Sequence, residues 1–347
     1  MSDPRDSGPG PAPLVATGER EALSSLLGEL GAALTRYWAT AAEVLRGGGV
    51  RLREPESDAF SLERNFFSLL FLYSYQRLGV PRERRVLYAI VNQCLRGMVT
   101  GCDNLLDDEY KPTLETDLPS GATRFRSVLD IMVSDRVLCE VLTEQARDGL
   151  LSSEQAVAAS NASLRALLRS GAQEASEEGG LAGGRLAPQA VLDTVHRYKT
   201  GLLFQAPWVV PRVLEPVDED RLAPVEEALY WIGIGCQVLD DLVDLGRDLR
   251  QGRHNYVASL ACHALDPGEW ERLEAWRARA SDEGVADLAL TAPRARQAAS
   301  RTALALLERG ARALFADADA GLVETSIAFL VRRIGADRLV GPDLPGS

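Results

Sequence analysis

The sequence contains two short acidic stretches, DNLLDDE at residues 103–109 and DDLVD at residues 240–244, each inside an apolar, helix-like segment. In each stretch two carboxylates lie four residues apart, so they project from the same face of a helix. Like charges at this spacing repel each other and destabilise a helix. Two such faces in one chain therefore predict that something positive compensates them.

Hard divalent cations take oxygen ligands, and Mg²⁺ is commonly held by a few carboxylates together with substrate phosphates. We therefore expect a magnesium–diphosphate site between two facing helices. The expected metal ligands are Asp103, Asp107, Asp108, Asp240, Asp241 and Asp244. Of these, the expected catalytic residues are Asp103, Asp107, Asp240 and Asp241.

The bulk composition indicates a globular protein and excludes several partners. The chain has 347 residues, of which 46% are hydrophobic and 25% charged, and a formal net charge of −12. This charge argues against nucleic acid or an anionic membrane as a partner, because both favour a basic surface. No apolar run reaches the roughly 18 residues that span a bilayer, so we expect no stable membrane insertion.

The cysteines and the N-terminal segment bear on location. Five scattered cysteines without paired spacing predict buried thiols in a reducing compartment, not disulfides or a zinc site. Residues 1–17 are rich in Pro, Gly and Asp and lack the basic and apolar regions of a secretory signal, so we expect a disordered tail. Together these features predict a cytoplasmic protein.

Helix-type hydrophobic spacing dominates the chain, and alternating strand patterns are nearly absent. These patterns predict an all-α fold with a single domain at residues 18–340. The Ala-, Glu- and Gly-rich segment 172–184 is expected to be a long loop between helices, with a domain linker as the alternative. Helices are expected at residues 19–45, 60–78, 82–110, 127–147, 153–168, 188–214, 224–249, 267–280, 292–314 and 321–334.

Around the second stretch the chain reads GIGCQVLDDLVD at residues 233–244. This resembles the second aspartate-rich motif of the trans-isoprenyl diphosphate synthases, with Cys236 in place of the usual Phe. YKTG at 198–201, DLRQGR at 248–253 and the first acidic stretch agree with that family in order and separation. The resemblance implies the class I isoprenoid synthase fold, a helical bundle around a deep apolar cavity with both acidic helices at its mouth.

The resemblance also implies the chemistry of the site. Three Mg²⁺ ions would bind the diphosphate of an allylic prenyl substrate, neutralise it as it leaves and orient the scissile bond. Lys199 is an implied diphosphate contact, because a lysine in an apolar helix beside a metal site needs an anion. The other expected substrate-binding residues are Thr200, Gln237, Arg247, Arg253, Phe71 and Phe204.

Two fates of the allylic cation separate two enzyme types. Chain elongation needs isopentenyl diphosphate as a second anionic substrate, which the family usually binds with a GGKRxRP element and an Arg pair after the first acidic motif. Here the first element reads GGVRLREP at 48–55, and the Arg pair is missing. Because each lost charge-assisted bond weakens the second diphosphate site, we favour a terpene synthase that cyclises one substrate. A trans-prenyltransferase is the alternative.

In the family that the chain resembles, bulky residues in the turn before the first acidic motif floor the cavity and shorten the product. Thr100, Gly101 and Cys102 are small, and Met98 is the residue that would block the cavity. The resemblance therefore favours a C15 to C25 substrate, with geranylgeranyl diphosphate as the first expectation. Aromatic faces would stabilise a cation in such a cavity. The aromatic candidates are Phe66, Phe67, Phe71, Tyr88, Phe204, Trp208 and Trp231.

We also expect a homodimer, in which the apolar stretch 60–78 forms either part of the interface or a core helix. A catalytically inactive partner subunit is a further alternative. It is disfavoured because such subunits usually lose aspartates from these motifs, and this chain keeps at least five.

Overall fold

The computed structural model describes residues 17–56, 58–107, 110–178, 180–181, 183–263, 267–279, 291–315 and 320–340. Within these ranges helices dominate, and the only β-type pairing is an isolated bridge between Leu52 and Thr116. The predicted all-α fold is therefore confirmed. Asp108 and most of the predicted N-terminal tail lie outside the described residues.

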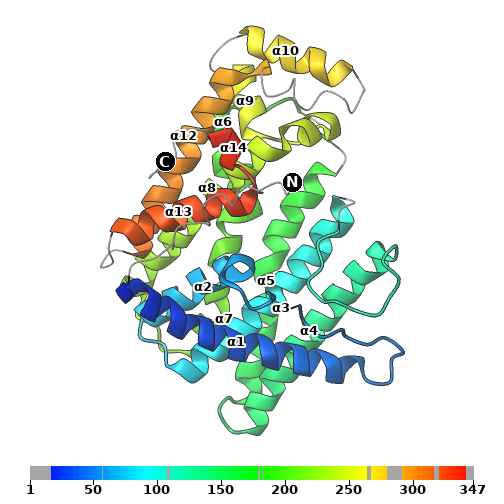
Figure 1. Cartoon of the computed structure of the whole chain (residues 1–347), viewed down its shortest axis with the longest axis vertical. Helices are drawn as coiled ribbons and strands as arrows, with labels where there is room; N and C mark the ends of the chain where they lie inside the picture. Colours follow the sequence, from blue (N-terminus) through cyan, green and yellow to red (C-terminus); the bar gives the residue numbers. More distant parts are fainter. Residues whose placement is uncertain are drawn as a thin grey trace, which may run out of the picture.

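The first half of the chain forms long helices and carries the first acidic stretch. They are α1 (Thr17–Leu45), α2 (Leu62–Arg77), α3 (Arg82–Leu106), α4 (Thr123–Arg147) and α5 (Ser153–Glu177). Helix α3 packs against α1 and α4, and α4 packs against α5. The first acidic stretch therefore begins in the last turn of a helix that is held on two sides (Figure 1).

The second half alternates short and long helical segments. The short segments are α6 (Pro188–Ala190), the π-helix η1 (Val191–Gly201), the 3-10 helix η2 (Leu203–Trp208), α7 (Val209–Leu214), α9 (Tyr256–His263) and α14 (Asp337–Val340). The longer ones are α8 (Glu219–Gln251), α10 (Pro267–Ala278), α12 (Pro293–Leu314) and α13 (Ala320–Ile334). Helix α8, which carries the second acidic stretch, packs chiefly against α12 and η1, while α10 lies at one end of the molecule (Figure 1).

Helix α5 is longer than the sequence predicted. It continues to Glu177, through the part of segment 172–184 for which we expected a loop. Its last turns carry polar side chains that bond to other elements: Ser170 Oγ donates to the carbonyl oxygen of Lys199 at 2.9 Å, and Glu177 accepts the N–H of His254 at 3.0 Å. The polar composition therefore serves contacts between elements and does not mark a loop.

The segment η1 winds as a π-helix. At its end the N–H of Leu202 bonds to the carbonyl oxygen of Arg197, five residues earlier, at 2.8 Å. Such turns are rare and occur frequently at functional sites. This one carries Lys199 and Thr200, and it lies against α8.

Helix α8 approaches its neighbours closely at two glycines. A Cβ atom on Gly233 would lie 2.9 Å from the carbonyl oxygen of Thr200 in η1, and one on Gly310 of α12 would lie 2.6 Å from the carbonyl oxygen of Ala228 in α8. Both distances are too short for a side-chain carbon. Glycine at these positions therefore lets α8 be clamped between η1 and α12.

All five cysteines are free, as predicted. Cys94 and Cys236 are buried, but Cys102 and Cys139 are exposed. The expectation of buried thiols is wrong for these two, because α3 and α4 turn them toward solvent. Among the described residues, no helix combines the length and the apolar character needed to cross a bilayer.

Candidate active site

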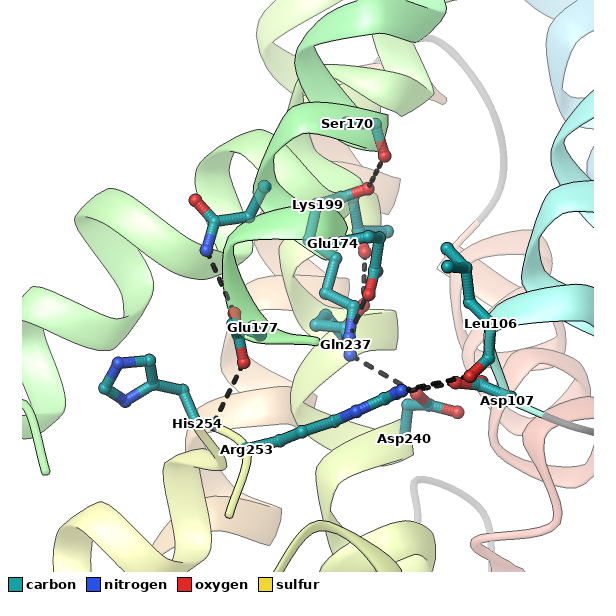
Figure 2. Close-up of polar contacts among 12 residues, drawn as sticks. Leu106, Asp107, Ser170, Glu174, Glu177, Lys199, Gln237, Asp240, Arg253 and His254 are labelled. Carbon is teal, nitrogen blue, oxygen red and sulfur yellow. Dashed lines mark hydrogen bonds and ion pairs between the residues drawn. The ribbon is translucent and has the colours of Figure 1, made fainter. Parts of the chain in front are cut away.

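The structure brings the two acidic stretches together through arginines that follow the second one. Arg253 Nη1 lies 2.6 Å from Asp107 Oδ1, and Arg247 Nη2 lies 3.7 Å from Asp107 Oδ2. Arg247 also pairs with Asp244. Figure 2 shows the Arg253 side chain extended toward Asp107, beside Asp240. The C-terminal part of α8 and the end of α3 therefore lie together, and we call the site between them the mouth.

Carboxylates crowd this mouth. Desolvation by the surrounding protein, followed by the nearby carboxylates of Glu174 and Asp107, raises the pKa of Asp103, although the residue itself is exposed. Burial, followed by the charges of Asp244 and its neighbour in the motif, raises the pKa of Asp240 to about 7. The negative charges of these carboxyl groups are not fully balanced by neighbouring positive charges, which fits a site that receives a cation.

Asp241 faces inward, and its carboxylate is already occupied. Its Oδ2 lies 2.9 Å from His196 Nε2 and also accepts the N–H of Tyr256. Its Oδ1 accepts a longer bond from Gln237 Nε2 at 3.4 Å. With 3% of its surface exposed, Asp241 is better placed to fix α8 against η1 and α9 than to bind a metal directly.

Of the residues expected to bind substrate, Thr200 and Gln237 bond to each other, whereas Lys199 pairs with Glu174 of α5. The hydroxyl of Thr200 donates to Gln237 Oε1, and Gln237 Nε2 donates to Asp240 Oδ2 at 3.2 Å. Lys199 Nζ lies 3.1 Å from Glu174 Oε1. Burial opposes the charge of Lys199, but Glu174 and further carboxylates outweigh it and raise its pKa. The lysine is therefore held as a cation beside the second acidic stretch.

Two carboxylates of the site were not expected from the sequence. Glu174 lies in the last turns of α5, close enough to Asp103 to raise its pKa, and Glu177 lies one turn further along. Both fall in the segment that was read as a loop. The signal that could have found them is their spacing with Ser170, because residues four and seven apart share one helix face.

Asn104 occupies the position where a second aspartate is usual in the first motif. It is buried, and its Nδ2 donates to the carbonyl oxygen of Lys111 at 3.0 Å while its Oδ1 accepts the N–H of Lys111 at 2.8 Å. An ionised carboxylate could only accept. The amide therefore fixes the chain that returns after α3, a role that the sequence pattern did not reveal.

The seven aromatic candidates divide by environment. Three pack in the hydrophobic core, namely Phe66, Tyr88 and Trp208. Trp231 lies under the guanidinium of Arg309, 4.0 Å from the ring centre. Phe204 stands edge-to-face with Phe67 and Phe71, at centroid distances of 5.5 and 5.9 Å, and all three rings are partly exposed. Phe71 and Phe204, the two rings expected to contact substrate, both belong to this cluster.

The donor atoms of the mouth fit magnesium better than softer metals. Among the described residues, no three His, Cys, Asp or Glu side chains converge closely enough to form a complete metal site. Mg²⁺ does not require one, because one or two carboxylates, substrate phosphates and water complete its octahedron. The oxygen-only set fits this pattern, and its described members at the mouth are Asp103, Asp107, Asp240 and Asp244.

Comparisons with known proteins place the fold. No protein-family model and no curated protein matches the sequence. Geranylgeranyl pyrophosphate synthetase from Pyrococcus horikoshii has a similar structure, with 14% identity and a TM-score of 0.59 over 92% of this chain and 100% of that chain. Polyprenyl synthetase from Streptomyces coelicolor is 20% identical, with a TM-score of 0.57 over 90% of this chain and 99% of that chain.

A third similar structure is that of geranylgeranyl pyrophosphate synthase from Corynebacterium glutamicum, solved with isoprenyl diphosphate and magnesium. It is 16% identical, with a TM-score of 0.57 over 91% of this chain and 98% of that chain. All three matches run along nearly the whole of both chains, so they concern the entire helical bundle. The chain therefore has the class I isoprenoid synthase fold, in the form found in the trans-isoprenyl diphosphate synthases.

Proposed function

We propose that the protein is a Mg²⁺-dependent enzyme that ionises an allylic prenyl diphosphate. The observation that carries this proposal is the meeting of two acidic helix ends with three cationic side chains, Lys199, Arg247 and Arg253, at one mouth. A diphosphate suits both sets, because cations bind its oxygens and carboxylates bind the metal ions that accompany it. The synthase from Corynebacterium glutamicum, which shares the fold, was solved with isoprenyl diphosphate and magnesium.

The residues divide the work as follows in this proposal. The carboxylates of the mouth would hold magnesium, for which the resemblance implies three ions, and the metal would supply Lewis-acid neutralisation of the diphosphate. Lys199 and Arg253 hold diphosphate oxygens and so orient the scissile C–O bond. Phe71 and Phe204 offer ring faces to the allylic cation, whose charge the ring quadrupole attracts.

For the fate of the cation we propose transfer to isopentenyl diphosphate. A C–C bond forms between the cation and the double bond of the acceptor, and the resulting cation loses a proton, which the released diphosphate can take up. The solved structures named above are all prenyl diphosphate synthases. They therefore favour the prenyltransferase, the alternative at the sequence level, over the cyclase that the missing Arg pair suggested. A likeness at this level of identity bears on fold, so the choice between the two also needs an observation from the chain itself.

Arg96 supplies an observation that favours a second anionic substrate. It lies two turns before Asp103, so both side chains project from the same face of α3. It makes long bonds to Asn65 Oδ1 at 3.4 Å and to the carbonyl oxygen of Arg64 at 3.5 Å, and it pairs with no carboxylate among the described residues. Burial, followed by the charges of Arg333 and Arg64, lowers the pKa of Arg96. An anion bound there would offset this unfavourable environment.

Cyclisation is the competing function, because no Arg pair follows the first acidic stretch. Arg126, one of the few cations near that stretch, is buried and donates to the carbonyl oxygens of Thr116 and Leu118. It is therefore committed to holding the loop. A cyclase needs only one diphosphate and would not require these donors.

Product analysis separates the two functions. Purified protein is incubated with Mg²⁺ and geranyl, farnesyl, geranylgeranyl or geranylfarnesyl diphosphate, each with and without isopentenyl diphosphate. We expect longer prenyl alcohols after phosphatase treatment, only when isopentenyl diphosphate is present and not in EDTA. Formation of a cyclic hydrocarbon from one diphosphate alone would contradict prenyl transfer and identify the protein as a cyclase. Failure to release diphosphate from every substrate would contradict the ionisation step that both functions share.

We propose a C15 to C25 substrate and a cytoplasmic location. A Cβ atom on Gly101 would lie 2.6 Å from Ile131 Cγ1, so the small residue there serves the packing of α3 against α4. The proposed C15 to C25 range therefore rests on the resemblance. The free cysteines are consistent with the proposed cytoplasmic location.

We also propose that the protein is a homodimer, but through a surface other than the stretch 60–78. Helix α2 belongs to the core, where Leu69, Leu72 and Tyr75 are buried. Large apolar side chains with exposed fractions of 36 to 62% instead lie on α4, on α5 and on the turn between them, and they are Phe125, Val128, Met132, Leu150, Val157, Leu164 and Leu168. We call these seven residues the apolar patch. A stable interface takes about 800 Å² per partner, and exposed apolar side chains on two neighbouring helices are suited to form its core.

Introducing charge into this patch tests the dimer. We expect the wild type to run at twice its 37.6 kDa mass in size-exclusion chromatography with light scattering, and the variant Met132→Glu/Leu164→Glu to run as a monomer. Two-fold symmetry places each new charge in the interface twice, so two substitutions bury four unpaired negative charges. The matched control is Ala42→Glu, an exposed position on α1. A monomeric wild type would refute the proposal.

A further inference from the structure

One face of α5, outside both acidic stretches, contacts the elements that carry the cations of the site. Ser170, Glu174 and Glu177 lie on this face, because residues four and seven positions apart are stacked on a helix. Figure 2 shows Ser170 and Glu174 directed toward Lys199, and Glu177 directed toward His254. The face therefore forms a third wall of the mouth, beside the ends of α3 and α8.

Two residues of this face hold Lys199. Ser170 Oγ donates to the carbonyl oxygen of Lys199 at 2.9 Å, and Glu174 Oε1 lies 3.1 Å from its Nζ. The exposed fractions of the two charged side chains are only 22% for Lys199 and 15% for Glu174. Such a pair is screened less by water and salt than a surface pair. Both the backbone and the ammonium group of one lysine are thus fixed from a single helix.

The third residue supports the second cation through the backbone. Glu177 is 5% exposed, its Oε2 accepts the N–H of His254 at 3.0 Å, and its Oε1 accepts a bond from Gln173 Nε2 at 2.9 Å. His254 directly follows Arg253, whose Nη1 lies 2.6 Å from Asp107 Oδ1. The Glu177 carboxylate therefore anchors the short segment from which Arg253 reaches across the mouth.

We propose that Glu174 and Glu177 are positioning residues that set Lys199 and Arg253 for the diphosphate, an inference that rests on the proposed function. A long lysine side chain loses rotamer freedom when it binds a ligand, and a fixed carboxylate partner imposes that loss in advance. As the C–O bond breaks, negative charge grows on the departing diphosphate. A cation already in place stabilises this charge without further reorganisation.

Glu174 could also act in two other ways, and each predicts a different result. If it accepted a proton from the prenyl cation, glutamine would be as damaging as leucine, because neither can take up a proton. If it only stabilised the fold, its replacement would lower Tm and leave kcat unchanged. A positioning role predicts that glutamine keeps much of the activity, since its amide oxygen still accepts a bond from the lysine.

A double-mutant cycle tests the inference. Diphosphate release is measured for the wild type, Glu174→Leu, Glu174→Gln, Lys199→Met and the Glu174→Leu/Lys199→Met double variant, with Tm recorded for each. We expect Glu174→Leu to lower kcat by about 10- to 100-fold, with KM changed by less than about threefold. Glu174→Gln should lie within about tenfold of the wild type. The double variant should be no slower than Lys199→Met, because Glu174 acts only through that lysine.

A parallel pair of variants addresses the second carboxylate. Glu177→Leu removes the acceptor of the His254 N–H and should lower kcat, whereas Glu177→Gln keeps an acceptor oxygen and should preserve most of it. The matched control is Glu178→Gln, which changes the adjacent, exposed carboxylate and should leave kcat unaltered.

The outcomes distinguish this inference from the function on which it rests. A wild type that releases no diphosphate from any allylic substrate overturns the proposed function, and the inference with it. If the wild type is active but the losses of kcat from Glu174→Leu and Lys199→Met multiply in the double variant, the inference alone is overturned. An equal loss of kcat in Glu174→Gln and Glu174→Leu also overturns the inference, because it would identify Glu174 as a proton carrier.

Discussion

Replacing Asp240 by asparagine is expected to lower the rate of diphosphate release by about 1,000-fold, because a Lewis-acid metal contributes several kcal/mol of transition-state stabilisation and each 1.36 kcal/mol is a factor of ten. The Oδ2 atom of Asp240 accepts a hydrogen bond from Gln237, and the side chain is partly exposed at the mouth. Asparagine keeps the shape but removes the charge that attracts magnesium. The measurement is steady-state diphosphate release over a range of Mg²⁺ concentrations.

The same variant should not lose stability. Burial and neighbouring carboxylates raise the pKa of Asp240 to about 7, so ionising it above that pH opposes folding, whereas below its unfolded pKa the cost is absent. At pH 8, in EDTA, the Tm of Asp240→Asn should therefore equal or exceed that of the wild type. The control is Asp220→Asn, an exposed position near the start of the same helix. Activity of Asp240→Asn within tenfold of the wild type would rule out a central role for this carboxylate.

Replacing Gly310 by alanine is expected to lower the free energy of unfolding by about 2 to 3 kcal/mol, the cost of overpacking a tight contact. A Cβ atom there would lie 2.6 Å from the carbonyl oxygen of Ala228 and 2.7 Å from Ile232 Cγ1. Backbone cannot move aside as a flexible side chain can, so α12 would be pushed away from α8. The measurement is the midpoint of thermal or urea unfolding.

An alanine in an ordinary helical position has the opposite effect, which gives this prediction its control. Nothing lies within 4 Å of a Cβ atom built on Gly28 of α1. There Gly→Ala should stabilise the helix by up to about 1 kcal/mol through its lower conformational entropy when unfolded. If Gly310→Ala proved as stable as Gly28→Ala, the close approach of α8 and α12 would be wrong.

The sequence predicted the fold and the main parts of the mouth because their signals are local. Hydrophobic spacing at three and four residues identified the long helices, and carboxylates four residues apart marked the ends of α3 and α8. The order of the family's motifs also identified Lys199 and Arg253 as candidate site residues. The functional choice between transfer and cyclisation was harder, because it depends on donors for a second anion that lie on several elements.

The sequence could not predict features that depend on partners distant in the chain. Residues Glu174 and Glu177 lie in the Ala-, Glu- and Gly-rich segment for which a loop is expected, yet α5 continues through them, and their partners Lys199 and His254 lie far along the chain. Asp241 resembles its neighbour Asp240 in the motif, yet its carboxylate is turned inward to His196. Local pattern gives residue type and spacing, whereas tertiary contacts decide which way each group faces.

The π-helical winding of η1 has a consequence for how this chain should be aligned. A π-helix takes more residues per turn than an α-helix, so each π turn amounts to an inserted residue. A chain that spans the same distance with ordinary α-helical winding would hold fewer residues between the positions of Val191 and Gly201. An alignment without a gap there would match Lys199 and Thr200 to side chains that, turned by about 100° per residue, point away from Glu174 and Gln237.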